Sequence, residues 1–129
     1  MVIDTSALVA ILVNEPERRL FNERIESDPR RLISAGTLLE SSLVLESRLG
    51  EIAGRELDLF LHRAGFEILV VDENQAEIAR GAFRKYGKGR HPAGLNFGDC
   101  FSYAAAVASG EPLLFKGDDF TKTNVEPAI

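Results

Sequence analysis

Four short runs of Val, Ile and Leu, separated by longer stretches with helical periodicity, most constrain the fold of this chain. They predict strands over 1–4, 31–35, 66–71 and 112–115, and helices over 5–13, 16–26, 37–49, 51–64, 73–86 and 97–109. Strands that alternate with helices pair in parallel, because each connection must return across a face of the sheet. The runs are almost wholly apolar, which indicates helices on both faces. We therefore predict an α/β fold with a central parallel sheet flanked by helices.

The length of 129 residues, 45% of them hydrophobic, suffices for one compact domain with its own core. We predict a single domain over residues 1–129. The longest apolar run, residues 7–13, is far shorter than the ~20 residues that span a bilayer, so no membrane span is expected. The first residues lack a basic leader and include Asp4, which predicts a cytoplasmic protein.

Acidic residues stand where the predicted elements would place them at one edge of the sheet. Asp4 ends the first strand, and the adjacent pair Asp118 and Asp119 follows the fourth. Glu40 is expected in the first turn of the helix after the second strand, and Asp99 in the first turn of the helix before the fourth. Because open parallel sheets bind ligands at the carboxyl ends of their strands, these acids are candidates for one site. Only tertiary packing can bring Asp99 back to that edge.

Each acid also has a purely structural explanation. Asp4 is a suitable N-cap for the helix that follows it. Glu40 fits a capping box with Thr37 as the cap. Asp99 stands three residues after Asn96, where a negative charge favours the start of a helix. Taken singly, each acid can be structural or functional.

The sequence lacks the motifs of other catalytic classes. It has no G-x-S-x-G elbow, no P-loop and no strand-linked G-x-G-x-x-G, and nothing pairs His62 with His91 as metal ligands. The single cysteine, Cys100, is interpreted as a small apolar helix residue. Several carboxylates held together against repulsion are what Mg²⁺ or Mn²⁺ require, because the ion supplies the missing positive charge. The acids therefore predict a site for one of these cations.

Four segments carry these acids: MVIDTSALVAIL, TLLESSLVLE, LNFGDCFSYAAA and LLFKGDDF. They resemble the successive motifs of PIN-domain proteins, most closely the VapC-type toxins of bacterial toxin–antitoxin pairs, in the family's order and over nearly the whole chain. The resemblance implies a PIN-like three-layer sandwich and a Mg²⁺- or Mn²⁺-dependent endoribonuclease that cleaves cellular RNA. It also implies a cognate VapB-like antitoxin and a homodimer.

The resemblance assigns roles to the acids. The expected metal ligands are Asp4, Glu40, Asp99 and the pair Asp118 and Asp119, and the catalytic set is Asp4, Glu40, Asp99 and Asp119. A bound metal lowers the pKa of a water molecule and stabilises charge on the scissile phosphate. Of the adjacent pair, Asp119 is favoured as the fourth acid, because Asp118 could cap a short turn anchored by Phe120. Ser6 could hydrogen-bond a metal ligand or a water, although a serine at a helix start often bonds only locally.

RNA needs a positive surface, and the net charge of −5 provides none over the chain as a whole. The sequence offers one basic stretch, RKYGKGRH, in a glycine-rich loop. The expected phosphate contacts are Arg84, Lys85, Lys88, Arg90 and His91, with Lys116 nearer the acids. Tyr86 is a candidate for stacking on a base. The alternative, a solvated basic loop with no ligand, stays open.

An antitoxin of this kind is expected to place an Arg or Lys near Asp4 and Asp99. Its apolar side chains are expected to pack against the early helices that contain Leu8, Ile11, Leu12 and Leu45.

Two other functions remain as alternatives. One is a catalytically silent PIN-like scaffold, which the intact acids disfavour. The other is a metal-dependent phosphatase with an aspartyl nucleophile. That chemistry usually needs a second Asp two residues after the first, where this chain has Ser6.

Overall fold

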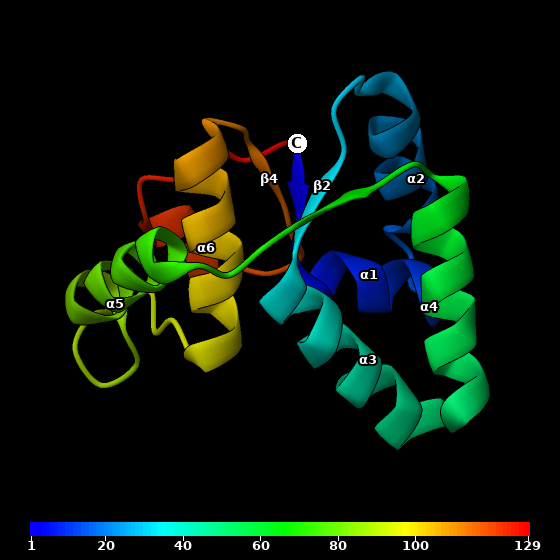
Figure 1. The fold of residues 1–129 in the computed structure, drawn as a ribbon, viewed down its shortest axis with the longest axis horizontal. Coiled ribbons are helices and arrows are strands. Elements are labelled where there is room, and N and C mark those ends of the chain that lie inside the picture. The colour runs from blue at the N-terminus through cyan, green and yellow to red at the C-terminus, as the bar shows by residue number, and fades with distance from the viewer.

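The four predicted strands form one parallel sheet in the computed structural model, which describes residues 1–129 (Figure 1). They are β1 (Val2–Ile3), β2 (Leu32–Ser34), β3 (Glu67–Leu69) and β4 (Leu113–Leu114). The sheet order is β3-β2-β1-β4, and Val2 pairs with both Leu32 and Leu113. The first strand therefore lies inside the sheet, and the carboxyl ends of all four strands lie at the same edge.

Six α-helices connect and flank the strands, each at its predicted place in the chain. They are α1 (Thr5–Leu12), α2 (Arg18–Ser27), α3 (Ala35–Leu49), α4 (Glu51–Arg63), α5 (Glu73–Tyr86) and α6 (Phe97–Ser109). A short 3-10 helix that was not predicted, η1 (Asp119–Lys122), follows β4. None of the helices is both long and apolar enough to cross a bilayer.

Helix α3 begins two residues earlier than predicted, because Ser34 rather than Thr37 is its cap. The Ser34 hydroxyl accepts a hydrogen bond from the Gly36 N–H at 3.2 Å. Thr37 lies inside the helix and is fully buried, and Glu40 falls in the second turn rather than the first. The predicted capping box of Thr37 and Glu40 is therefore wrong, and both side chains make other contacts.

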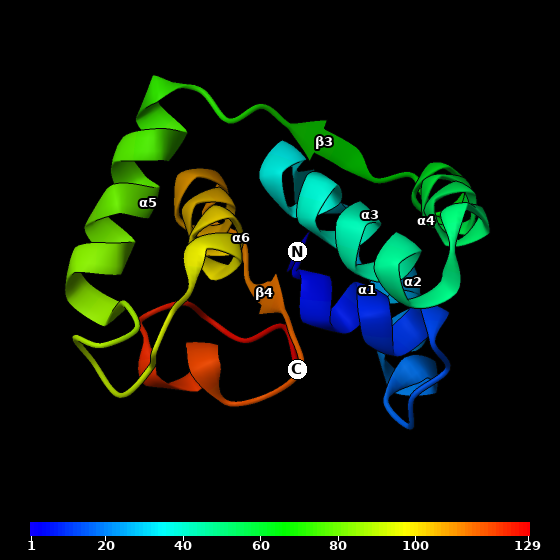
Figure 2. The same ribbon diagram turned by 90° about the horizontal axis from the view of Figure 1, so that it is seen from below.

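Two apolar clusters, one on each face of the sheet, make the fold a three-layer sandwich (Figure 2). On one face, Ile3 and Ile33 pack with helices α1 to α4. On the other face, Val2 and Leu32 pack with α5 and α6. Successive residues of a strand point to opposite faces, so β1 and β2 contribute to both clusters. The predicted α/β sandwich is confirmed.

Strand β3 differs from the prediction for residues 66–71, because it is a short strand at the edge of the sheet. It pairs only with β2, and Figure 2 shows it and its link to α5 running along the outside of the molecule. The exposed fractions of Ile68, Val70 and Val71 are 51%, 70% and 40%. The expectation that helices cover both faces of every strand is therefore wrong for β3. An apolar run alone does not distinguish an edge strand from a central one.

The inward faces of α1 and α3 belong to the protein's own core. Leu8, Ile11 and Leu45 expose at most 2% of their surface, and only Leu12 of the predicted antitoxin contacts is partly exposed. A partner that packs against these helices must therefore contact side chains other than Leu8, Ile11 and Leu45. An apolar helix stripe predicts burial, and it does not say whether the burying element belongs to the same chain.

Candidate active site

Asp4 lies at the carboxyl end of β1, where it both caps α1 and faces the other acids. Its Oδ2 accepts hydrogen bonds from the backbone N–H and the hydroxyl of Ser6, at 3.0 and 2.7 Å. Its Oδ1 accepts one from the Ser102 hydroxyl at 2.5 Å. The side chain is held from both sides and buried, so its role as a cap does not compete with a role in the site.

Glu40 reaches the site because α3 and α6 approach closely at two glycines. A Cβ atom on Gly98 would collide with the Glu40 carboxyl group, and one on Gly36 would collide with the Phe101 ring. The Glu40 carboxyl therefore rests on the first turn of α6. The Thr5 hydroxyl donates a hydrogen bond to Glu40 Oε1 at 2.5 Å. Burial raises the pKa of Glu40, the bond from Thr5 opposes the rise, and the charge of Asp4 adds to it.

Asp99 opens α6 in a capping box with Asn96. The Asn96 N–H donates to Asp99 Oδ2 at 3.0 Å, and the Asp99 N–H donates to Asn96 Oδ1 at 2.9 Å. Burial is the main reason that the pKa of the Asp99 carboxyl rises to about 7, although the bond from Asn96 opposes the rise. The charges of Asp4, Asp119 and Glu40 add to it. Four acids from separate parts of the chain therefore act on one another.

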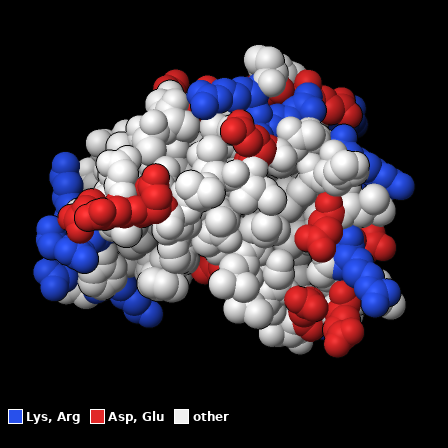
Figure 3. All heavy atoms as spheres, in the orientation of Figure 1, with Lys and Arg blue, Asp and Glu red and all other residues white.

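Asp4, Glu40 and Asp99 line one open hollow at the carboxyl edge of the sheet, which we call the active hollow. The other side chains around it include Thr5, Ser6, Glu15, Arg48, Asn96 and Lys116. Figure 3 shows the molecular surface hollowed along its lower edge, with an acidic side chain visible inside. The structure thus brings together three acids that are separated by tens of residues in the sequence.

The donor set of the hollow suits a hard divalent cation, because carboxylate and hydroxyl oxygens are the ligands that Mg²⁺ and Mn²⁺ prefer. A bound cation would also relieve the repulsion that raises the pKa of Asp99. As they stand, the carboxylates bond to protein groups, and no three acidic, histidine or cysteine side chains are poised around one ion. Binding therefore requires the three carboxylates to draw closer together around the ion.

Comparison with known proteins places this fold and site in a family. A family model described as PIN domain matches residues 1–126. The chain belongs to the PIN-domain family. It is 59% identical to Ribonuclease VapC of Mycolicibacterium smegmatis, over 97% of each chain. It is 58% identical to Ribonuclease VapC30 of Mycobacterium tuberculosis, over 97% of this chain and 95% of that one.

A solved structure has the same fold as this PIN domain. It is VapC20 of Mycobacterium tuberculosis, described as a Sarcin-Ricin loop cleaving toxin. The two structures align with a TM-score of 0.79 over 96% of this chain and 95% of that one, at 17% identity. At that identity the likeness concerns the fold, and it confirms the predicted PIN-like sandwich.

The adjacent acids Asp118 and Asp119 lie at the start of η1, and both are exposed. Asp119 is near enough to Asp99 for its charge to raise the pKa of that carboxyl, whereas Asp118 is not among the groups that do so. Asp118 makes no capping hydrogen bond with its side chain, although it precedes η1. Because both carboxylates are exposed, solvent screens the repulsion between the two adjacent charges. The metal-binding role of either acid stays a prediction.

Lys116 lies at the rim of the hollow, as its place after β4 suggested. Its backbone N–H donates to Ser6 Oγ at 2.9 Å, which ties the end of β4 to the start of α1. Its ammonium pairs with Glu15 and lies 3.3 Å from Glu17. The hydrogen bond that the ammonium donates to Glu15, and then its contact with Glu17, raise the pKa of Lys116. The cation next to the PIN-domain acids is thus paired with two glutamates of the α1–α2 connection.

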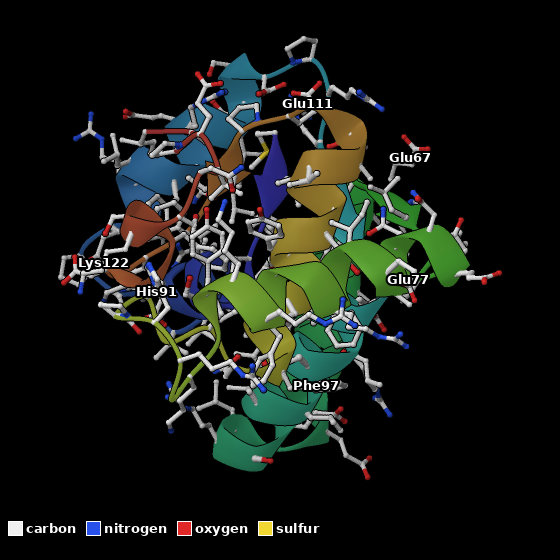
Figure 4. The ribbon with its side chains drawn as sticks, turned by 90° about the vertical axis from the view of Figure 1, so that its left-hand side faces the viewer. Glu67, Glu77, His91, Phe97, Glu111 and Lys122 are labelled. Atoms are coloured by element: carbon white, nitrogen blue, oxygen red, sulfur yellow. The ribbon has the colours of Figure 1, made fainter.

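The predicted basic loop leaves the end of α5 and leads directly into the capping box of α6. Arg84, Lys85, Lys88 and Arg90 are exposed, and His91 is partly exposed. Figure 4 shows His91 and Phe97 near the two ends of the segment that enters α6. None of these bases lines the hollow, so the loop can contact RNA only beside it.

Tyr86 cannot stack on a base as predicted, because it is 6% exposed. Its ring meets the His91 ring edge-on at 5.1 Å and lies 5.9 Å from the Tyr103 ring. The Ala93 N–H donates to His91 Nδ1 at 3.0 Å, so this histidine helps to hold the loop. Tyr86 is a core residue that anchors the base of the loop.

Several residues of the site were not found from the sequence. Arg48, in the last turn of α3, lines the hollow, and Ser102 contacts Asp4 from α6. Gly98 permits the close approach of Glu40. Gly98, directly before Asp99 in the first turn of a helix, was the one signal in the sequence for this close approach. Glycine destabilises a helix, so its presence there suggests that a larger side chain would not fit.

Proposed function

We propose that this chain is a metal-dependent endoribonuclease that acts as the toxin of a type II toxin–antitoxin pair. The observation that carries the proposal is the convergence of Asp4, Glu40 and Asp99 on one hollow. It occurs in a PIN domain that is 58–59% identical, over nearly its whole length, to proteins named as VapC ribonucleases.

Asp4, Glu40 and Asp99 would hold Mg²⁺ or Mn²⁺, with Asp119 as the fourth acid. A bound ion of this kind lowers the pKa of a water molecule and stabilises charge that builds on a phosphate. The chain's own contribution is to hold the carboxylates. Ser6 fixes one oxygen of Asp4, and Thr5 favours the charged form of Glu40.

Positive charge for the RNA backbone would come from two places. Arg48 and Lys116 lie at the hollow itself, where they can contact the phosphate next to the scissile bond. The basic loop lies beside it and would contact phosphates further along the strand. The predicted contacts through Arg84, Lys85, Lys88, Arg90 and His91 belong to this second group.

The test is a cleavage assay with Mg²⁺ or Mn²⁺ on RNA and, in parallel, on a small phosphoester. Asp4→Asn and Asp99→Asn should each abolish RNA cleavage, whereas Asp58→Asn, an exposed acid on α4, should leave it unchanged. Cleavage of the small phosphoester alone would favour the phosphatase. Binding of RNA without cleavage at any metal concentration would favour a silent scaffold.

A VapB-like antitoxin is proposed as the partner, and its apolar contacts need side chains other than the buried Leu8, Ile11 and Leu45. Leu12 lies at a hollow between α2 and α4 that also includes Leu59 and Phe60. We expect a flexible antitoxin segment to lay apolar side chains there and to place an Arg or Lys near Asp4. Leu59→Glu should then weaken antitoxin binding without reducing cleavage, and inhibition should weaken as Mn²⁺ rises.

A homodimer is proposed through apolar side chains that flank the active hollow. Leu39 and Leu43 of α3 and Phe97 of α6 are 62%, 58% and 79% exposed, and the Phe97 ring packs edge-on against Phe101. Neighbouring exposed apolar side chains mark interaction surfaces. Leu43→Glu should yield a monomer in size-exclusion chromatography with light scattering. Leu20→Glu, at a 50% exposed position on α2, should not.

A further inference from the structure

Buried hydroxyl groups lie between the active hollow and the core. Thr37 of α3 and Ser102 of α6 are fully buried, and their hydroxyl oxygens lie 3.1 Å apart. The residues that follow Ser102 on α6 include three buried alanines, at 104, 105 and 106. Alanine would therefore fit the packing of this helix, whereas a buried hydroxyl is unfavourable unless it is hydrogen-bonded. The serine at position 102 needs a reason beyond packing.

The charge of Asp4 determines which atoms donate in this cluster. An ionised carboxylate can only accept hydrogen bonds, so Ser102 donates its single hydroxyl proton to Asp4 Oδ1, 2.5 Å away. Ser102 has no second proton, and the 3.1 Å contact with Thr37 must therefore have Thr37 as the donor. The hydrogen bonds run in one direction, from Thr37 to Ser102 to Asp4.

The two oxygens of Asp4 are held by different parts of the chain. Ser6, two residues away, donates to Oδ2 through both its N–H and its hydroxyl. These local bonds leave Oδ1 unsupported, and Ser102 is the residue that donates to it, from 98 positions along the chain. The plane of the Asp4 carboxylate is therefore fixed only when α6 supplies this hydroxyl.

We propose that Ser102 and Thr37 are positioning residues that hold Asp4 in the orientation that binds the metal ion, and that they thereby set the metal affinity of the site. This inference rests on the proposed function. Groups that orient metal ligands from behind contribute strongly to affinity, because a ligand that is already oriented loses less freedom on binding. The Thr37–Ser102 pair acts only through Asp4 and does not touch the substrate.

The decisive measurement is calorimetric titration of Mn²⁺ into metal-stripped protein. Ser102→Ala should raise the dissociation constant about tenfold or more. The matched control is Ser109→Ala on the same helix, where the hydroxyl bonds only to backbone groups, chiefly to the Ala105 carbonyl at 2.7 Å. That variant should bind Mn²⁺ like the parent. Cleavage by Ser102→Ala should be weak at low Mn²⁺ and return toward the parent rate as Mn²⁺ is raised.

A second pair of variants tests the Thr37 hydroxyl without creating a large cavity in the core. Thr37→Val keeps the shape and removes the hydroxyl, and it should weaken Mn²⁺ binding by less than Ser102→Ala does, because Ser102 still reaches Asp4. Thr37→Ser keeps the hydroxyl and should restore affinity close to that of the parent. If Ser102→Ala does not fold, this pair decides the question by itself.

The outcomes separate the positioning role from the proposed function. No Mn²⁺ binding by the parent, or equal binding by parent and Asp4→Asn, would overturn the metal centre itself. Binding by the parent that is lost in Asp4→Asn but unchanged in Ser102→Ala and Thr37→Val would show that the centre exists and that these hydroxyls do not position it.

Discussion

The active hollow and the basic loop carry opposite charges, and the protein builds them in opposite ways. The carboxylates of the hollow come from β1, α3 and α6, and hydrogen bonds from Ser102, Ser6 and Thr5 hold them. The bases of the loop are exposed, and one of them, Arg90, makes only a long contact with the Phe83 ring, 5.7 Å from its centre. The orientation of the carboxylates is fixed in the hollow, whereas the side chains of the loop contribute charge without a fixed orientation.

This difference predicts how each region responds to change. A small displacement in the hollow should cost much, because metal ligands and reacting groups must meet within a fraction of an ångström. A change in the loop should cost little for each residue, because an exposed charge interacts with RNA through screened electrostatics.

Apart from changes to the acids themselves, the largest effect is expected from Gly98→Ala. The added methyl group meets the Glu40 carboxyl, which must move off the first turn of α6. Cleavage should fall by about 10²-fold, the cost that a displacement of ~1 Å can carry. Gly81→Ala is the matched control, since it adds the same atom to α5 where nothing lies within 4 Å. Equal activity of the two variants would show that the position of Glu40 is not critical.

Charge reversal in the loop should have a smaller and graded effect. Replacing Arg84, Lys85 and Arg90 with Glu should weaken RNA binding and reduce the slope of log K against log salt by about 2, at ~0.7 for each lost phosphate contact. Metal binding should not change. A control that reverses three exposed arginines on α2 and α4 uses Arg19, Arg55 and Arg63. Equal loss of binding in both variants would mean that only net charge matters and that the loop is no binding surface.

A more modest effect concerns the metal-free protein and pH. The pKa of the Asp99 carboxyl is about 7 in the folded chain and near 3.8 when exposed, so the folded state binds the proton more tightly. The protonated Asp99 carboxyl therefore adds to the free energy of unfolding. This contribution is full below about pH 4 and is lost as pH rises toward 7. Asp99→Asn should remove this pH dependence and raise the Tm near pH 7 by roughly 4 °C for each kcal/mol regained.

Thermal melts between pH 5 and 8 in the presence of a chelator would measure this effect. Adding Mg²⁺ should stabilise the parent at pH 7.5 and leave Asp99→Asn nearly unchanged. An identical dependence of Tm on pH for parent and variant would show that folding does not raise the pKa of the Asp99 carboxyl.

The smallest effect on RNA binding is expected from Tyr86→Leu, which removes the aromatic ring. Because the ring is buried against His91 and Tyr103, RNA binding should stay within about twofold of the parent, well below the ~1 kcal/mol or more that a lost base stack costs. Equilibrium binding of a single-stranded RNA would measure it. A larger loss would place Tyr86 on the RNA surface and weaken the contrast between the two regions.

The fold was predictable to the extent that it depends on local pattern. The four apolar runs and six helical stretches were placed within a few residues, because periodicity and caps depend on neighbours three or four positions away. Only β3 was misjudged, since its run of apolar residues is as strong as that of a central strand. Exposure of Ile68 and Val70 follows from the order of strands in the sheet, which no local window contains.

Burial was the second quantity that the sequence left open. Leu8 and Leu45 belong to helices that were expected to meet a partner, and Tyr86 was expected at the RNA, yet all three side chains lie in the core. Their residue types suit both a core and an interface, because removing apolar surface from water is favourable in either environment.

The sequence by itself determined the helices and strands, the cap at Asp4 and the capping box of Asn96 and Asp99, because each of these depends on residues a few positions apart. Tertiary structure alone decided that Glu40 rests on Gly98 and that Ser102 holds Asp4. Those contacts join residues 58 and 98 positions apart, and they form only when α3 and α6 pack against β1. The local sequence places each acid at the end of a strand or near the start of a helix, and only the packing of the whole chain brings the acids together.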